Sequence, residues 1–307
     1  MLKTYKLSNG RLVSSAEGDN ADLYVYVDPD EKEKAYLTGA LLVDEHTLNS
    51  AFDPDELGRV EFENNHVAAI VKKPKRYTSD DHFFFKVSSV GLFLYSDKLV
   101  IVTNNDDFNW DARIFIKMHV AKDIFLRVIF QCVLHFEEHL RVIRKISDEL
   151  EEEINKTISN KDLLNMFKLN KGLVYYLDAI NSNNKVIERL KINSAKLAFD
   201  QEENEFIDDL IIECNQCFQQ ADSYLEVLSS LINSWASIIN NNLNIRIRRL
   251  TVVSICIMTP TFVVSLFSMN VPLPLPQSGT ILSFWVVTAM ALMSVLGLLL
   301  IGYFKKL

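Results

Sequence analysis

Charged side chains are missing from the C-terminal part of this 307-residue chain. Between Arg249 and Lys305 there is no Asp, Glu, Lys or Arg, so the preceding residues carry almost all the charge behind the net value of -8. A helix that crosses a bilayer core needs about 20 predominantly apolar residues. The charge-free region provides two such segments, 250–269 and 281–304, and predicts two membrane spans joined by a turn at 270–280.

Glycine and cysteine are also scarce, with nine and four residues. No P-loop pattern is present, so nothing indicates a transporter driven by ATP. The first 15 residues lack the apolar stretch of a signal peptide, and we expect the large N-terminal part to stay in the cytoplasm with unpaired thiols. We expect no enzyme activity, no organic cofactor and no nucleic-acid partner. The four cysteines are Cys132, Cys214, Cys217 and Cys256.

Basic residues flank the pair of spans at both ends. Arg246, Arg248 and Arg249 precede the first span, and Lys305 and Lys306 follow the second. Because cytoplasmic flanks are enriched in Lys and Arg, both termini are expected in the cytoplasm and 270–280 is expected to be an outer loop. The pattern predicts a multi-pass protein of the inner or plasma membrane, with a basic cytoplasmic tail at 305–307.

Residues 1–118 mix strand and helix signals. Apolar runs at 22–28, 66–73 and 82–105 predict strands, the last run with a turn near residue 96, and a helical pattern covers 41–52. From 119 to 200 the pattern is helical, with expected breaks at 159–161 and 181–185. We therefore expect an α/β cytoplasmic domain followed by a helical cytoplasmic region.

The segment 201–269 reads as one long helix that continues into the first membrane span. No strong stop signal precedes Pro260, and a helix of this length would extend on the order of 100 Å. Its cytoplasmic part carries a heptad seam, which predicts a parallel bundle formed with other copies of the chain. The seam consists of Ile207, Leu210, Cys214, Cys217, Ala221, Tyr224, Leu228, Leu231, Trp235, Ile238, Asn242 and Ile245.

Hydroxyl side chains follow one face of the first span at steps of three and four residues. Two interpretations are open: the hydroxyls bond their own carbonyls or neighbouring helices, or they line a pore at the centre of an oligomer. A hydroxyl-lined pore without carboxylates suits an ion that keeps its water shell, and magnesium loses that shell reluctantly. Membrane potential supplies roughly 4.6 kcal/mol per 100 mV to a divalent cation. The face comprises Thr251, Ser254, Met258, Thr261, Ser265 and Ser268.

The sequence MTPTFVVSLFSMN, the two C-terminal spans, the basic end FKKL and the long preceding helix resemble the CorA family of magnesium transporters. The similarity is clearest over 244–307 and weaker around 59–71 and 147–154. The resemblance implies an α+β membrane protein with a cytoplasmic αβα domain. It also implies a stalk helix continuous with the first span, and assembly as a funnel-shaped homopentamer.

The same resemblance implies roles for particular residues. The family's Gly-Met-Asn motif falls on Ser268, Met269 and Asn270, and the Asn forms a ring that receives hydrated magnesium. Family pore positions fall on Asn244, Leu250, Met258 and Thr261, and a family proline matches Pro260. This chain departs from the family in Ser268 and in the outer loop VPLPLPQSGT, which has no acidic residue to attract cations.

Acidic residues cluster without a basic residue at the start of the long helix. The plain interpretation is a solvated face. The alternative is a regulatory magnesium sensor, in which divalent cations relieve the repulsion between the acidic residues of neighbouring copies. In the family, an Asp of this helix pairs with an acidic residue of a neighbouring subunit. The resemblance places the helix Asp at Asp209, beside Asp208, with Asp53 as the candidate partner. The cluster comprises Asp200, Glu202, Glu203, Glu205, Asp208, Asp209 and Glu213.

Two further motifs resemble metal sites. HFEEH at 135–139 places two histidines one helical turn apart, but no third ligand for zinc is identifiable. Cys214 and Cys217 form a lone C-x-x-C on the heptad seam, where core packing explains them.

The sequence as a whole predicts a homopentameric channel that passes hydrated magnesium inward and is gated by cytosolic magnesium. One alternative is a relative that moves zinc, cobalt, nickel or another divalent cation, in some cases outward. A second alternative is a membrane-anchored sensor or scaffold that does not conduct.

Overall fold

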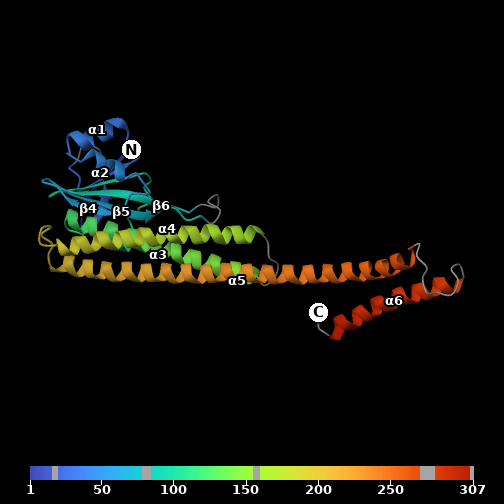
Figure 1. Ribbon diagram of the computed structural model, residues 1–307. Coiled ribbons are helices and arrows are strands. Elements are labelled where there is room, and N and C mark those ends of the chain that lie inside the picture. Colours follow the sequence, from blue (N-terminus) through green and yellow to red (C-terminus); the bar gives the residue numbers. More distant parts are fainter. Residues whose placement is uncertain (16–19, 78–83, 155–159, 270–280, 305–307) are drawn as a thin grey trace. The chain divides into compact units, whose positions relative to one another are not determined.

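The computed structural model describes residues 1–15, 20–77, 84–154, 160–269 and 281–304. The chain divides into two compact units, Met1–Ile232 and Asn233–Leu307. The first unit contains the sheet and the helices packed on it (Figure 1). The second contains the C-terminal part of helix α5 (Gln201–Phe267) and helix α6 (Ile281–Phe304).

A seven-stranded sheet forms the centre of the first unit, with strand order β2-β1-β3-β7-β6-β5-β4. Only the β3–β7 pair is parallel, and the other neighbours are antiparallel. The runs at 22–28 and 66–73 each contain a strand as predicted, and the described part of the run at 82–105 contains two strands joined by a turn. The strands are β1 (Leu2–Ser8), β2 (Arg11–Ser14), β3 (Leu23–Val27), β4 (Arg59–Phe62), β5 (Val67–Pro74), β6 (Val87–Leu94) and β7 (Leu99–Thr103).

Helices cover both faces of this sheet, which confirms the αβα architecture. The short helices α1 (Glu31–Gly39) and α2 (Glu45–Ser50) lie over one face, where Leu37 and Leu48 join Phe93 and Val102 in a buried cluster. The long helices α3 (Ala121–Ile154) and α4 (Asn160–Ile192) cover the other face (Figure 1). A sheet buried on both faces explains why β5, β6 and β7 are almost continuously buried.

Helix α4 does not break at 181–185, where the sequence predicted a break. Ser182 and Asn183 are buried, and both side chains bond the backbone of the sheet unit. Asn183 accepts from the Lys72 amide at 2.7 Å and donates to the Lys72 carbonyl at 2.7 Å. These contacts across the fold outweigh the weak helix propensity of Asn and Ser, because they satisfy buried polar groups.

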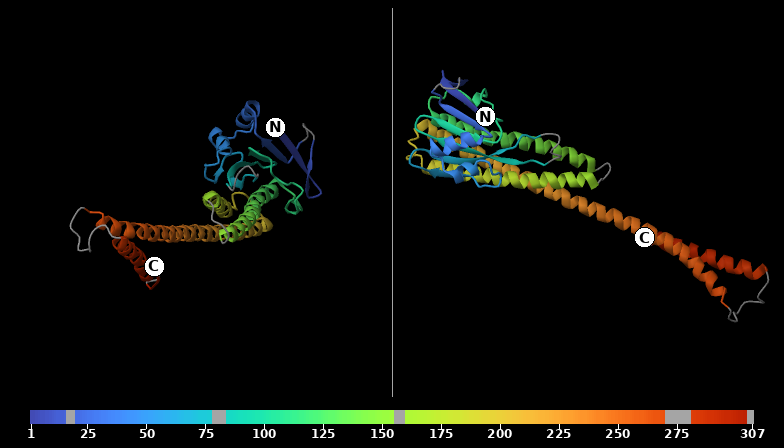
Figure 2. Two further views of the ribbon diagram at one scale, coloured as in Figure 1. Left: turned by 90° about the vertical axis from the view of Figure 1, so that its right-hand side faces the viewer. Right: turned by 90° about the horizontal axis from the view of Figure 1, so that it is seen from above.

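The heptad seam of α5 packs within its own chain between 207 and 228. Ile207, Leu210, Cys214, Ala221 and Leu228 are at most 1% exposed. The Cys214 thiol donates to the Ile180 carbonyl of α4, and Phe206 of α5 stacks edge-on against Phe130 of α3. Figures 1 and 2 show this part of α5 alongside α3 and α4. The prediction that this part of the seam binds other copies is therefore wrong: the two preceding helices already cover it.

Helices α5 and α6 are long and apolar enough to cross a membrane. None of the apolar window of α5 is buried, and only 6% of that of α6 is. The α5 helix continues through Pro260 to Phe267. Side chains such as Ile257, Phe262, Leu282 and Leu296 are more than half exposed, as expected for surfaces that contact lipid or other copies of the chain.

Candidate functional site

The hydroxyl face of α5 is exposed, and three of its hydroxyls bond the helix backbone. Thr251 Oγ1 donates to the Ile247 carbonyl at 2.9 Å, and Thr261 Oγ1 donates to the Ile257 carbonyl at 2.8 Å. Ser268 Oγ donates to the Val264 carbonyl at 2.9 Å. The first interpretation of the stripe, local bonding, thus holds for these three residues. A hydroxyl that donates to a carbonyl still has acceptor capacity on its oxygen, so the bonds leave an acceptor-rich face.

The other predicted pore positions also lie on the exposed surface of the helix. Leu250 and Met258 are each 68% exposed, and Asn244, Ser254 and Ser265 are exposed as well. No described residue packs over this face. A surface of this kind is available to other copies of the chain, to lipid or to water.

Helix α5 ends at the predicted selectivity motif. Phe267 is its last residue, and the Ser268 amide donates to the carbonyls of Val264 at 3.1 Å and Ser265 at 3.2 Å. Met269 is 55% exposed. Asn270, the rest of the 270–280 loop and the 305–307 tail lie outside the described residues. The serine therefore holds the last turn through both its amide and its hydroxyl.

The acidic cluster at the start of α5 has more than one role. Asp200 and Glu203 form a reciprocal capping arrangement at 2.8 Å in both directions, which starts the helix. Burial raises the pKa of the Glu203 carboxyl. Asp208 accepts from the Lys191 ammonium of α4 at 2.8 Å, whereas Asp209 is exposed and pairs with no basic group of the described chain. Of the two predicted regulatory aspartates on α5, Asp209 is the one without a basic partner among the described residues.

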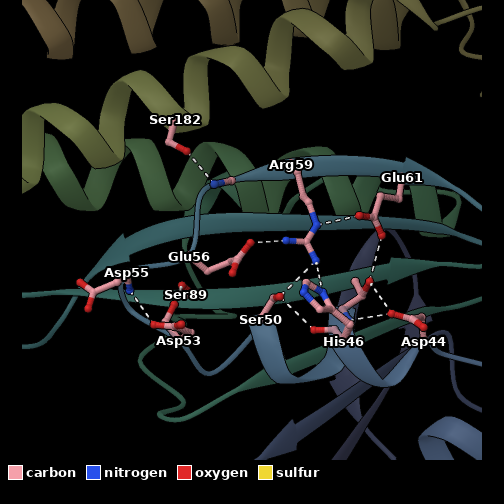
Figure 3. A network of polar contacts seen from close by, with 12 residues as sticks. Asp44, His46, Ser50, Asp53, Asp55, Glu56, Arg59, Glu61, Ser89 and Ser182 are labelled. Carbon is pink, nitrogen blue, oxygen red and sulfur yellow. Dashed lines mark hydrogen bonds and ion pairs between the residues drawn. The ribbon is translucent and has the colours of Figure 1, made fainter.

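Asp53 lies in the loop that follows α2 (Figure 3). Its carboxylate accepts from the Asp55 amide at 2.8 Å, and its carbonyl accepts from the Ser89 hydroxyl and, at 3.4 Å, from the Lys72 ammonium. Lys72 is only 4% exposed, and burial lowers its pKa to about 8. Sequence reasoning missed this buried ammonium, because Lys72 and Lys73 read as the polar end of a strand.

Arg59 is a second cation that the sequence did not single out. Its guanidinium pairs with Glu56, donates to Glu61 Oε1 at 2.7 Å and donates to the Ser50 hydroxyl at 3.1 Å (Figure 3). An internal positive charge therefore lies beside Ser50.

No group of three or more His, Cys, Asp or Glu side chains suited to a metal ion occurs among the described residues. Asp53 and Asp209 are not brought into one ligand set within a single copy. A regulatory metal at these residues would need carboxylates from a second copy.

The two metal-like motifs belong to the core of the first unit. His139 Nδ1 lies 2.7 Å from the Tyr176 hydroxyl, and its ring packs against Phe85. Burial lowers the pKa of His139 to about 4, so the ring is neutral near pH 7. Cys214 and Cys217 are buried on the seam, and burial raises the pKa of each thiol to about 12. Core packing of the two cysteines is thereby confirmed.

Comparison with known proteins extends these observations. A family model described as "CorA-like Mg2+ transporter protein" matches residues 23–306. The cobalt/magnesium transport protein CorA of Methanocaldococcus jannaschii is 25% identical over 289 residues, which are 91% of this chain and 88% of that protein.

Solved structures share the fold. The complete CorA magnesium transporter from Methanocaldococcus jannaschii has a TM-score of 0.80 at 18% identity and covers 99% of this chain and 97% of its own. The full-length CmaX protein has a TM-score of 0.72 at 12% identity, with 97% of each chain covered. The cytoplasmic domain of ZntB from Vibrio parahaemolyticus has a TM-score of 0.57 at 11% identity and covers 79% of this chain and 97% of its own. Because the family model spans nearly the whole chain, both units included, the chain belongs to the CorA-like Mg2+ transporter family.

Proposed function

We propose that this chain assembles as a homopentameric channel through which hydrated magnesium enters the cytoplasm, driven by the membrane potential. Membership of the CorA-like Mg2+ transporter family supports the proposal. The observation that carries it is the exposed hydroxyl face of α5, which ends at Ser268-Met269 directly before Asn270. Copies of this face around a common axis would form successive rings of oxygen atoms.

The hydrogen-bond directions on this face suit a hydrated cation. Thr251, Thr261 and Ser268 donate their hydroxyl hydrogens to backbone carbonyls, so their oxygens can act as acceptors toward the pore. Water bound to magnesium presents hydrogens outward, and magnesium keeps several of its waters. The face thus offers acceptors to the hydration shell without the tight ligands that would trap the bare ion.

Regulation by cytosolic magnesium forms part of the same proposal. Asp209 is exposed and uncompensated, and in an oligomer it would lie at the surface of each stalk helix. Asp53 of a neighbouring copy is the proposed partner, and Asp208 contributes less because Lys191 already pairs with it. Magnesium bound between copies would hold the assembly closed, and loss of the ion would release it.

The proposal is tested with the purified full-length chain in lipid vesicles that hold a fluorescent magnesium indicator. With an inside-negative potential, wild type is expected to admit magnesium, and Asn270→Ala is expected to lose most of this influx. Vesicles that stay impermeable with an intact oligomer would instead support a scaffold without conduction.

The choice of cation is tested in the same vesicles. Magnesium, cobalt, nickel and zinc are supplied separately, and each flux is measured in both directions. The proposal expects inward magnesium flux to dominate. Selective zinc flux, or flux that is mainly outward, would instead support the alternative of a transporter for zinc or another divalent cation.

A further inference from the structure

A cavity of about 700 Å³ lies in the first unit between α4 and one end of the sheet. Small-molecule sites typically occupy about 300–1,000 Å³. Three segments line the cavity: the loop at 54–58, the chain around β5 and the start of β6, and the middle of α4. It is separate from the hydroxyl face of α5, and the proposed transport mechanism makes no use of it.

The loop wall of the cavity is held in place by α4. The Gly58 amide donates to the Ser182 hydroxyl at 2.6 Å. A Cβ atom on Gly58 would lie 2.9 Å from that hydroxyl and 3.0 Å from the Ile70 carbonyl, so the loop approaches the helix as closely as a glycine permits. The Asn183–Lys72 bonds fasten the adjacent strand to the same helix.

The wall at 84–87 is also anchored. Phe85 is 1% exposed and stacks on Tyr77 with ring centroids 4.6 Å apart. It packs against Gly172 of α4, where a Cβ atom would lie 3.1 Å from the Phe85 amide nitrogen. All three walls are therefore formed before any ligand arrives, which lowers the entropy cost of binding.

The lining combines three kinds of side chain. Lysines 72, 75, 86 and 185 supply positive charge, and Asp55, Glu56 and Asp178 supply carboxylates. Glu56 is already paired with Arg59, whereas Asp55 and Asp178 form no ion pair with any residue that the structure describes. Phe84 and Tyr175 supply aromatic rings in edge contact, with centroids 5.9 Å apart.

This combination restricts the ligand chemistry. A free anion would be repelled by Asp55 and Asp178, and a free metal ion would be repelled by the lysines. A complex of a metal ion with a polyphosphate suits the lysines and the carboxylates together. Lysines bind phosphate, and magnesium is typically held by one or two carboxylates plus phosphate oxygens. The aromatic pair adds ring faces for a flat base, which would take the place of the Lys171 ammonium that lies 5.5 Å from the Phe84 centroid and 5.7 Å from the Tyr175 centroid.

We propose that this cavity binds a complex of magnesium with a nucleoside polyphosphate. Lys75 and Lys185 contact the phosphates, Asp55 and Asp178 face the ion through its waters, and Phe84 and Tyr175 hold the base. Lys72 forms the floor, where its ammonium is fixed by the Ser89 hydroxyl at 2.7 Å and the Pro54 carbonyl at 3.0 Å. Such a site would report nucleotide-bound magnesium to a domain attached to the membrane helices.

The site is tested by titration calorimetry on the full-length chain in detergent. The probes are ATP with magnesium, ATP with the metal removed by a chelator, magnesium tripolyphosphate, and adenosine. Saturable binding of the magnesium–ATP complex is expected, at least about tenfold tighter than that of the other three probes. Equal affinity for metal-free ATP or for tripolyphosphate would overturn the proposal, as would the absence of saturable binding at millimolar concentration.

Variants separate the cavity from general surface charge. The double variant Lys75→Glu/Lys185→Glu is expected to weaken the complex by about a hundredfold or more, since it replaces two phosphate-binding ammonium groups by carboxylates that repel phosphate. Tyr175→Leu is expected to lower the affinity for the magnesium–ATP complex and to leave the affinity for magnesium tripolyphosphate unchanged. Lys145→Glu, on the exposed surface of α3, is the control and is expected to leave affinity within about twofold. Equal losses in the control and the double variant would contradict a defined site. Because binding is measured without flux, these results are independent of the transport proposal.

Discussion

The Asn183 side chain of α4 and the Lys72 backbone of β5 exchange two hydrogen bonds, each 2.7 Å long. Strand β4 pairs with β5 only as far as Arg59 opposite Ile70. Beyond that point, the side chain amide takes the place of a neighbouring strand. One asparagine thus satisfies both backbone polar groups of the buried residue Lys72 and joins the helical layer to the sheet.

Asn183→Ala is expected to destabilise the first unit by about 2–4 kcal/mol, because it leaves a buried amide and a buried carbonyl without partners. Hydrogen exchange followed by mass spectrometry would report this as faster exchange in the β5 peptide. Asn181→Ala, at an exposed position of the same helix, is the matched control and is expected to leave that peptide unchanged. Unchanged exchange of the β5 peptide in Asn183→Ala would contradict a stabilising role for the Asn183–Lys72 hydrogen bonds.

Thr261→Val is expected to reduce magnesium influx several-fold, since it removes an acceptor oxygen from the proposed pore face and keeps the side-chain shape. Thr259→Val is the matched control: Thr259 bonds the Ile255 carbonyl at 2.8 Å in the same way but projects from another side of α5. Vesicle influx assays compare the two. Equal effects from both substitutions would indicate a structural role for the hydroxyls and no pore role.

Ser268→Gly is expected to raise magnesium influx. The serine holds the last turn of α5 through its amide and its hydroxyl, and glycine would free the chain to adopt conformations that serine resists. Ser268→Ala removes the hydroxyl alone and serves as the comparison. If the alanine variant conducts as well as the glycine variant, the hydroxyl bond and not backbone freedom limits conduction.

Asp209→Asn is expected to weaken inhibition by cytosolic magnesium by several-fold, because it removes an uncompensated carboxylate from the stalk. Asp208→Asn should have a smaller effect, since Lys191 already neutralises that side chain. Single-channel or vesicle flux recordings at graded internal magnesium would give the two inhibition constants. A larger shift in Asp208→Asn would contradict the assignment.

Because the Lys72 ammonium is buried, we expect the stability of the first unit to depend on pH. Burial lowers its pKa from 10.5 to about 8, against the opposing effects of Asp53, Glu56 and Asp55. Between these two values the unfolded chain binds more protons at this site than the folded chain, so the folded state gains stability as pH rises.

The melting temperature of wild type is therefore expected to rise relative to Lys72→Met between pH 8 and 10.5. Thermal unfolding of the full-length protein in detergent, repeated across this range, measures the difference between the two. A constant difference for Lys72→Met would show that the ammonium does not titrate in this window.

Much of the fold was predictable because its signals are local. The alternation at 22–28 and the apolar run at 66–73 became β3 and β5. The charge-free segments became the apolar end of α5 and the whole of α6. The break expected at 181–185 was wrong, since buried partners on the sheet hold Ser182 and Asn183 in the helix. Composition alone could not reveal those partners.

The candidate site was also predictable from the sequence only in part. The hydroxyl spacing placed Thr251, Thr261 and Ser268 on one face of a helix, and the structure adds that each of them donates to its own backbone. The difference between Asp208 and Asp209 was invisible in sequence, because it depends on Lys191, which lies on another helix.

The amino-acid sequence by itself determined where the chain is apolar enough for a membrane, where its long helix runs and which family motif ends that helix. These properties follow from composition and from the 3.6-residue period, which act over short distances along the chain. Only the tertiary structure decided that the 207–228 seam is covered by α3 and α4, that Lys72 is buried and that a cavity forms beside α4. Each of these depends on residues far apart in sequence, whose contacts exist only once the layers have packed.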